Sequence, residues 1–194
     1  VVITKNDKAG LNGPRAGIMV GRKDLVAKIS AKANEIGCEA RAPISLAVYR
    51  SLSKFTESDL LEEVEIGKDI FNELVKQVGS ENVRSSLLGP EVTAETVLKL
   101  ILEMSGTKAH ENVLVPAEAT AALGMELLKR HGIITTNACG MPGARISVRF
   151  KTNKQNLENI GSAKKVAEAF LDSVKAVGEY AKDLNTARQV ILGV

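Results

Sequence analysis

Two short β-like runs at the start of the chain enclose a glycine-rich segment, and they limit what residues 1–21 can form. The runs 1–4 and 16–20 are mostly apolar and rich in Val and Ile, and Gly13-Pro14 stands between them. Proline has no N–H to donate and glycine weakens regular structure, so the pair predicts a turn between two strands. The chain opens inside a run that is typical of a buried strand and lacks a Met, so we expect missing upstream sequence or a processed product.

Apolar residues recur at helical spacing over the segment that follows. This spacing predicts helices over 23–36 and 43–52, the first ended by a glycine and the second opened by a proline. A longer helix is expected from Thr56 or Ser58 to Val78, with acidic residues in its first turns. We expect this helix to link two lobes.

The second half of the chain has the pattern of a small α+β lobe. Residues 96–104 fit either a strand or a helix, and we favour a strand. Further along we expect a helix from Pro116 to Leu128, strands at 133–136 and 145–150, and a last helix from Asn159 or Ser162 that residues 183–194 extend. An order of strand, helix, strand, strand and helix is typical of an α+β fold.

Composition excludes several classes of protein. Hydrophobic residues make up 44% of the 194 residues, enough for a core without disulfides or metal. The formal charge is +3 and basic residues alternate with acids, so nucleic-acid binding is not supported. Cys38 and Cys139 lie far apart without a CxxC pair, and no apolar run reaches membrane-spanning length. We therefore expect a reduced, cytoplasmic protein that binds no metal and no membrane.

Lys8 follows Asp7 at the end of the first β-like run, immediately before the glycine-rich segment. A primary amine held there is suited to meet a carbonyl compound, because glycines allow close approach without a Cβ in the way. The pattern of Asp-Lys followed by Gly-Pro is weak, and by itself it favours a solvated turn lysine.

Four segments together resemble the selenocysteine synthase group, formally L-seryl-tRNA(Sec) selenium transferase, and especially its archaeal relatives of uncertain function. They are Asp7-Lys8 with Gly13-Pro14-Arg15-Ala16-Gly17-Ile18-Met19-Val20-Gly21, then Gly37-Cys38-Glu39-Ala40-Arg41-Ala42-Pro43, then Gly132-Ile133-Ile134-Thr135, and finally Gly140-Met141-Pro142-Gly143 ahead of Ser147-Val148-Arg149. The resemblance covers most of the chain and thins between Asn82 and Asn112.

The resemblance implies an α/β fold, the C-terminal part of a fold-type I enzyme that depends on pyridoxal 5'-phosphate (PLP). Residues 1–55 would be the end of the large-domain sheet, 56–80 the linking helix and 81–194 the small α+β domain. The upstream large domain, or a partner chain, would be needed to complete the cofactor site, because the acidic partner of the pyridine nitrogen lies upstream in that group.

The resemblance also implies the residues at the site. Lys8 would carry PLP as a Schiff base, with Thr4 and Asn6 near the phosphate, although each of these two also fits an ordinary turn position. In that group the lysine is one residue closer to the Gly-Pro pair, so Lys5 is the alternative amine. Arg15 could meet a phosphate or carboxylate, or bond loop carbonyls instead.

Alternation places Arg145, Ser147 and Arg149 on one face of their strand. The resemblance gives Arg149 the α-carboxylate of the substrate, and a strand arginine paired with a surface acid is the alternative. The implied function is a PLP-dependent transferase or lyase that acts on an amino acid or aminoacyl substrate by β-elimination, replacement or transfer. A homo-oligomer with sites between subunits is expected. The other reading is a non-catalytic scaffold or oligomerisation module with the same fold.

Overall fold

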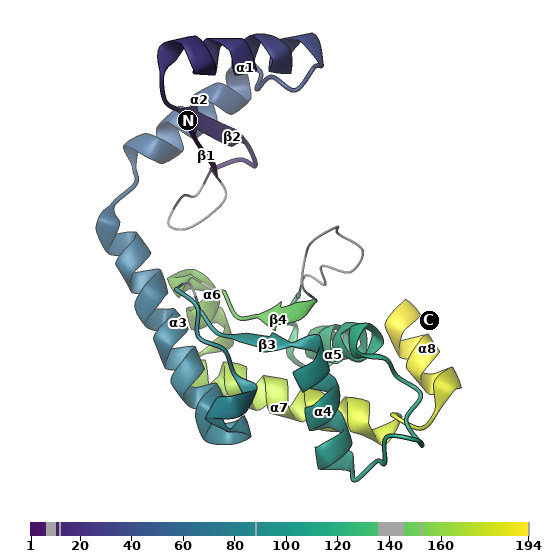
Figure 1. Cartoon of the computed structure of the whole chain (residues 1–194). Helices are drawn as coiled ribbons and strands as arrows, with labels where there is room; N and C mark the ends of the chain where they lie inside the picture. Colours follow the sequence, from purple (N-terminus) through teal and green to yellow (C-terminus); the bar gives the residue numbers. More distant parts are fainter. Residues whose placement is uncertain (7–10, 12, 88, 136–145, 152, 194) are drawn as a thin grey trace. The chain divides into compact units, whose positions relative to one another are not determined.

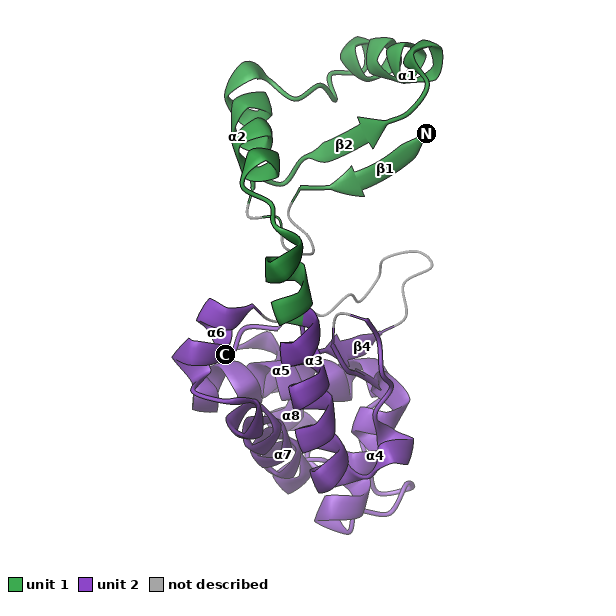
Figure 2. Ribbon diagram, turned by 90° about the vertical axis from the view of Figure 1, so that its left-hand side faces the viewer, with its two compact units in different colours: residues 1–63 green, residues 64–194 purple. Residues whose placement is uncertain are grey.

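The computed structural model of the chain describes residues 1–6, 11, 13–87, 89–135, 146–151 and 153–193. They divide into two compact units, here called unit 1 (residues 1–63) and unit 2 (residues 64–194) (Figure 2). The segment 56–80, expected as a linking helix, forms α3 (Glu57–Val78) followed by the short 3-10 helix η1 (Ser80–Asn82). The division between the units falls inside α3.

Unit 1 consists of a two-stranded hairpin and two helices, as the sequence predicts. β1 (Val2–Lys5) pairs antiparallel with β2 (Gly17–Val20), in a register that sets Lys5 opposite Gly17. The helices are α1 (Lys23–Glu35) and α2 (Ala42–Ser53), which has a proline in its first turn. The two predicted strands on either side of Gly13-Pro14 are confirmed, and residues 7–10 and 12 of their connection lie outside the described residues.

Unit 1 has no apolar core of its own among the residues that the structure describes. The side chains buried in residues 1–63 are the polar Asn6 and Ser51. Val2 and Ile3 are 68% and 67% exposed, so the expectation of a buried first strand is wrong for this chain by itself. Since a lone hairpin is marginally stable in water, these apolar faces suit a surface that other polypeptide covers.

Helix α3 carries the first stripe of the core. The N–H of Asp59 donates to Thr56 Oγ1 over 3.3 Å, so Thr56 caps the helix, as one of the two predicted alternatives had it. Further along, the helix buries one residue in every turn on one face, namely Ile66, Ile70, Leu74 and Val78. Gly79 then ends it with a φ of 88°.

Among its described residues, unit 2 packs a short sheet, the C-terminal part of α3 and five further α-helices around one core. β3 (Glu91–Thr93) pairs antiparallel with β4 (Ser147–Arg149), and Val92 lies opposite Val148 with both side chains buried. Helix α7 contacts α4, α5 and α6 (Figure 1). The ring of Phe170 in α7 meets that of Phe150 edge-on, with ring centroids 5.5 Å apart. The helices are α4 (Ala94–Ser105), α5 (Pro116–His131), α6 (Lys154–Ile160), α7 (Ala163–Glu179) and α8 (Leu184–Leu192).

The prediction of a strand at 96–104 is wrong, because these residues lie in helix α4. Thr93 caps the helix by accepting the N–H of Thr96 over 3.3 Å. Val97, Leu100 and Ile101 are buried at helical spacing, on the side where α4 contacts α5 and α7. The local pattern allowed both structures, and packing against distant helices favours the helix.

The expected strand at 133–136 is also absent from its described part, 133–135. Gly132 has a φ of 66°, and the N–H of Ile133 donates to Leu127 O over 3.1 Å, so these residues form the C-terminal cap of α5. The strand at 145–150 is confirmed at Ser147–Arg149, and residue 145 lies outside the described residues.

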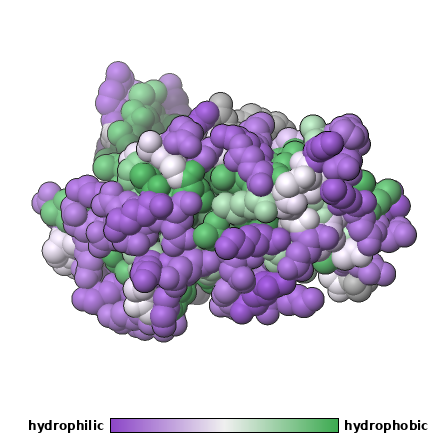
Figure 3. All heavy atoms as spheres, turned by 90° about the horizontal axis from the view of Figure 1, so that it is seen from below, coloured by the Kyte–Doolittle hydropathy of each residue, from purple (hydrophilic) through white to green (hydrophobic). Residues whose placement is uncertain are grey.

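Side-chain caps also divide the C-terminal region into more helices than predicted. Asn153 accepts the N–H of Asn156 over 2.9 Å and opens the separate helix α6. Ser162 then opens α7, and Asp183 opens α8 as a new helix instead of an extension. In the described part of the chain no helix has the length and apolar character to cross a membrane. Hydrophilic side chains predominate on the face seen in Figure 3, with apolar ones in smaller groups.

Candidate functional site

The base of the β1–β2 connection is closed at Asn6. The N–H of Asn6 donates to Ala16 O over 2.9 Å, which extends the hairpin by one residue pair. On the other side, the N–H of Gly13 donates to Asn6 O over 3.4 Å. The amide Nδ2 of Asn6 also donates to Pro14 O over 3.5 Å. Asn6 therefore joins the two ends of the segment that contains Lys8.

The Asn6 side chain is 0% exposed and lies against Gly13. A Cβ built on Gly13 would overlap Asn6 Nδ2 and would lie 2.9 Å from Cβ of Ser51 in α2. Both separations are below the 3.0 Å that real Cβ atoms essentially never show, so any side chain at position 13 requires Asn6 or Ser51 to shift. Asn6 Oδ1 and Ser51 Oγ are buried, and neither has a hydrogen-bond partner among the described residues. We call Asn6, Gly13 and Ser51 the hairpin clamp.

The structure brings most of the predicted site residues into this hairpin. Lys8 itself lies outside the described residues, as does residue 7. Thr4 and the alternative amine Lys5 are exposed in β1, and Arg15 is exposed before β2. Asn6 is buried, with its amide directed into the clamp, and its contact with a cofactor phosphate stays a prediction. The Lys5 amine, the Thr4 hydroxyl and the Arg15 guanidinium therefore all come from one hairpin of unit 1.

Arg149 belongs to unit 2, on strand β4. It lies opposite Glu91 of β3, and its Nε is 3.3 Å from Glu91 Oε2. The Arg149 side chain is 67% exposed, whereas that of Glu91 is only 18% exposed. The structure thus pairs Arg149 with a neighbouring acid, which is the alternative that the sequence left open. The role of Arg149 toward a substrate carboxylate stays a prediction.

A buried polar network in unit 2 was not predicted. Glu126 of α5 is 4% exposed, and it accepts the hydroxyl of Tyr180 over 3.2 Å and Nε of Arg130 over 2.7 Å. Burial, and then the negative charge of Glu126, raise the pKa of Tyr180. The hydrogen bond that Arg130 donates to Glu126 raises the pKa of the Arg130 guanidinium as well. The i, i+4 spacing of Glu126 and Arg130 is visible in the sequence, whereas Tyr180 is too distant in sequence to be paired with them.

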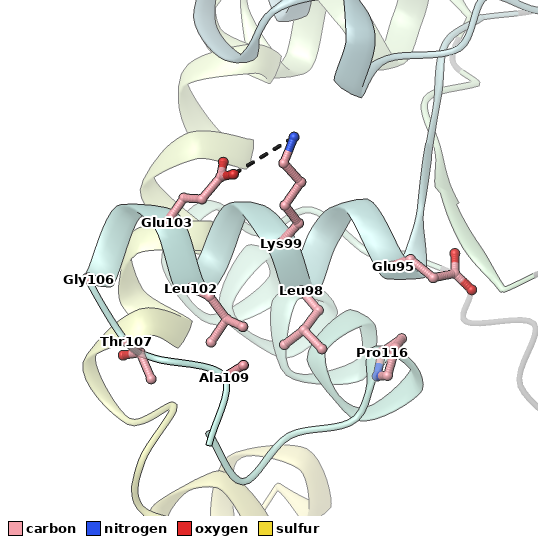
Figure 4. A pocket seen from close by; sticks show the side chains of 9 residues that line it. All are labelled: Glu95, Leu98, Lys99, Leu102, Glu103, Gly106, Thr107, Ala109 and Pro116. Carbon is pink, nitrogen blue, oxygen red and sulfur yellow. Dashed lines mark ion pairs between the residues drawn. The ribbon is translucent and has the colours of Figure 1, made fainter. Parts of the chain in front are cut away.

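A groove of about 640 Å³ follows helix α4 and the connection to α5 (Figure 4). Its apolar floor includes Leu98 and Leu102, and the charged pair Lys99–Glu103, 3.8 Å apart, lies at its side. A second, smaller pocket lies between α3 and the residues Ser85, Ser86, Gly89 and Pro90. Within the described ranges, no three His, Cys, Asp or Glu side chains come close enough together to hold a metal ion. Neither hollow contains a residue that the sequence predicts for catalysis.

Comparisons with known proteins point to one group of relatives. A family profile described as "UPF0425 C-terminal domain" matches residues 95–161. A protein of Methanothermobacter thermautotrophicus named "UPF0425 pyridoxal phosphate-dependent protein" is 30% identical over all of this chain and 47% of its own length. A similarly named protein of Methanococcus maripaludis is 33% identical over 90% of this chain and 43% of its own length.

A third similarly named relative, from Methanosphaera stadtmanae, is 29% identical over 77% of this chain and 37% of its own length. A fourth, from Methanopyrus kandleri, also carries a name that states dependence on pyridoxal phosphate. The chain spans about half the length of the curated relatives that it matches, or less. Similarity to such proteins therefore extends through the hairpin with Lys8 as well as through unit 2.

Proposed function

We propose that this chain is the lysine-bearing part of a PLP-dependent enzyme of the fold-type I, selenocysteine synthase-like kind. Its substrate would be an amino acid or an aminoacyl compound. Two observations carry the proposal: the homologues of this chain are named as pyridoxal phosphate-dependent, and Lys8 lies in the sequence between the paired strands β1 and β2. The names of the relatives support the cofactor, and they leave the reaction open.

The residues present fit one part of a PLP site. The hairpin supplies an amine at Lys8, and exposed Thr4 and Arg15 can donate hydrogen bonds to an anion such as a phosphate. The described part of the hairpin carries no carboxylate that could pair with the pyridine nitrogen. In line with the resemblance, we propose that the acidic partner and the group that stacks on the ring come from an upstream large domain or a partner chain.

In the proposed reaction, PLP supplies an electron sink that stabilises negative charge at a substrate carbon. Lys8 would hold the cofactor covalently through its ε-amino group and, once released, would move a proton at the α carbon. Arg149 would bind the α-carboxylate with two parallel hydrogen bonds, in competition with Glu91. These roles correspond to β-elimination, replacement or group transfer.

The polypeptide that completes the site would cover the apolar faces of unit 1. Ile3, Leu46 and Tyr49 are 67%, 53% and 69% exposed, and α1 buries no residue. Surfaces of this kind are typical of interfaces. The natural candidate is the part of the relatives that this chain does not match, about half of their length. We include a homo-oligomer with sites between subunits in the proposal.

The proposal can be tested by binding PLP to this chain in complex with the unmatched part of the Methanothermobacter relative. A visible absorbance band should appear with PLP, should be lost in Lys8→Ala and should persist in Lys5→Ala. The two lysines are close in sequence and differ in their predicted role, so each variant is a control for the other. A stable complex that gives no band at saturating PLP would refute the proposal and would favour a non-catalytic scaffold.

A further inference from the structure

We propose that Arg84 and Arg149 together bind two anionic groups of one small molecule, so that the substrate is an amino acid with a second acidic group. The inference deepens the proposed function and rests on it for the α-carboxylate that Arg149 binds. The sequence predicts Arg149 as a binding residue and gives no such signal for Arg84. All residues that carry the inference are described and belong to unit 2.

Arg84 extends the β3–β4 sheet by one residue on the far side of β3. Its N–H donates to Glu91 O over 2.8 Å, and its carbonyl accepts the N–H of Glu91 over 2.9 Å. Across the other edge of β3, Glu91 lies opposite Arg149 of β4 (Figure 1). Glu91 therefore stands between the two arginines in one row across the sheet. We call Arg84, Glu91 and Arg149 the charged row.

The side chains of the charged row share one face of this sheet. Residues directly opposite each other on neighbouring antiparallel strands point to the same face, and successive residues of a strand point to opposite faces. Each member of the row is next in sequence to a buried valine of the core, namely Val83, Val92 and Val148. Since these valines occupy the core face, the charged row occupies the outer face.

The charged row has one positive charge in excess. Two guanidiniums flank a single carboxylate, and Nε of Arg149 is 3.3 Å from Glu91 Oε2. The guanidinium of Arg84 is exposed and has no ion-pair partner within the described ranges. Main-chain hydrogen bonds fix Arg84 beside Glu91. It is therefore a second cation on the face where Arg149 would receive a ligand.

The arrangement of the charges selects the kind of ligand. A guanidinium binds a carboxylate through two parallel hydrogen bonds. The two arginines are two strand spacings apart, about 10 Å between their backbones. The negative charge of Glu91 repels an anionic group placed midway between them. The charged row therefore favours two separate anionic groups over one compact anion such as phosphate, and an amino acid with an acidic side chain carries two such groups.

The experiment compares L-glutamate with L-glutamine, which has nearly the same shape and lacks the second negative charge. Each amino acid is titrated into this chain without PLP at constant pH and ionic strength. NMR shifts of the backbone amides and arginine Nε–H groups of the charged row give the dissociation constants. The variants are Arg84→Gln, Arg149→Gln and Glu91→Gln. Arg188→Gln is the control, because Arg188 is exposed in α8, outside the β3–β4 sheet.

The unsubstituted chain should bind L-glutamate about fivefold more tightly than L-glutamine, as a favourable exposed ion pair allows. Arg84→Gln should remove this preference and leave the affinity for L-glutamine unchanged. Arg149→Gln should weaken the binding of both amino acids, and Glu91→Gln should strengthen the binding of L-glutamate. Arg188→Gln should change neither affinity. An effect of net charge alone would instead give equal losses for Arg84→Gln and Arg188→Gln.

Equal affinities for the two amino acids in the unsubstituted chain, or no binding of L-glutamate, would overturn the inference. A preference for L-glutamate that persists in Arg84→Gln would overturn it as well. The PLP function is measured separately, by the label that borohydride reduction fixes on Lys8 in the complex. A preference that depends on Arg84 without any label would refute the PLP function alone, whereas a label without the preference would refute this inference alone.

Discussion

Replacing Leu74 by alanine should destabilise unit 2 much more than replacing Leu46 destabilises unit 1. Leu74 in α3 is 0% exposed, whereas Leu46 in α2 is 53% exposed. Both residues lie inside helices and lose the same three carbon atoms, so the change in helix propensity is equal. The comparison therefore isolates the burial of each side chain.

The expected magnitudes follow from the exposed fractions. Removing three buried carbons costs about 2.4 kcal/mol at about 0.8 kcal/mol each. The cavity left at a fully buried leucine raises the loss to about 3–5 kcal/mol. For Leu46 about half of the transfer term applies and solvent fills the space, which gives about 1 kcal/mol, confined to unit 1.

The assay uses the two tyrosines of a chain without tryptophan. In a Tyr49→Phe background, fluorescence comes from Tyr180, which is buried in unit 2. Urea titration should show a midpoint lowered by about 1–5 M for Leu74→Ala, from a loss of about 3–5 kcal/mol and a typical slope of about 1–3 kcal/mol per M. Leu46→Ala should leave this midpoint unchanged. Equal shifts for the two variants would refute the conclusion that the apolar core lies in unit 2.

Three further predictions concern charge. Burial raises the pKa of Tyr180, so the contribution of this residue to the free energy of unfolding should be constant below about pH 10 and fall above it. Urea titration of Tyr180→Phe above pH 10 should therefore show a smaller fall. Hydrogen bonds from Thr186 lower the pKa of Asp183, so the stabilisation of α8 by Asp183 should be present above about pH 4 and be lost at lower pH. Amide exchange in α8 should accordingly become faster at lower pH. The variant Asp183→Ala should show this faster exchange at every pH. If Arg149 binds a substrate carboxylate, calorimetry with L-serine should show about tenfold weaker binding for Arg149→Lys. The variant Glu91→Gln should lose no affinity, because it frees the Arg149 guanidinium from its ion pair. Equal losses of affinity in the two variants would contradict that role.

Local signals were sufficient for the elements that carry their own caps and stops. The two strands on either side of Gly13-Pro14, the cap at Thr56 and the C-terminal glycine at Gly132 are all visible in the sequence and present in the structure. Residues 96–104 could not be assigned in this way, because their apolar residues fit both periods. Contacts of α4 with α5 and α7, from distant parts of the chain, favour the helix.

The residues of the candidate site likewise fall into those that the sequence groups together and those that only tertiary packing brings close. The sequence locates Lys8, Thr4 and Arg15 in one hairpin, since their grouping depends only on neighbours in the chain. Ser51, which closes the clamp from α2, and Glu91, which pairs with Arg149 across the β3–β4 sheet, could not be found in this way. Their contacts depend on how separate elements pack, and no local pattern encodes that packing.

The most direct test of the central claim is to locate the PLP-derived label in the borohydride-reduced complex by peptide mass spectrometry. The claim that Lys8 carries the cofactor predicts one stoichiometric label on the peptide that contains residue 8, at Lys8 itself. A label confined to Lys5, or spread over exposed lysines of α1 and α3 at substoichiometric levels, would contradict it.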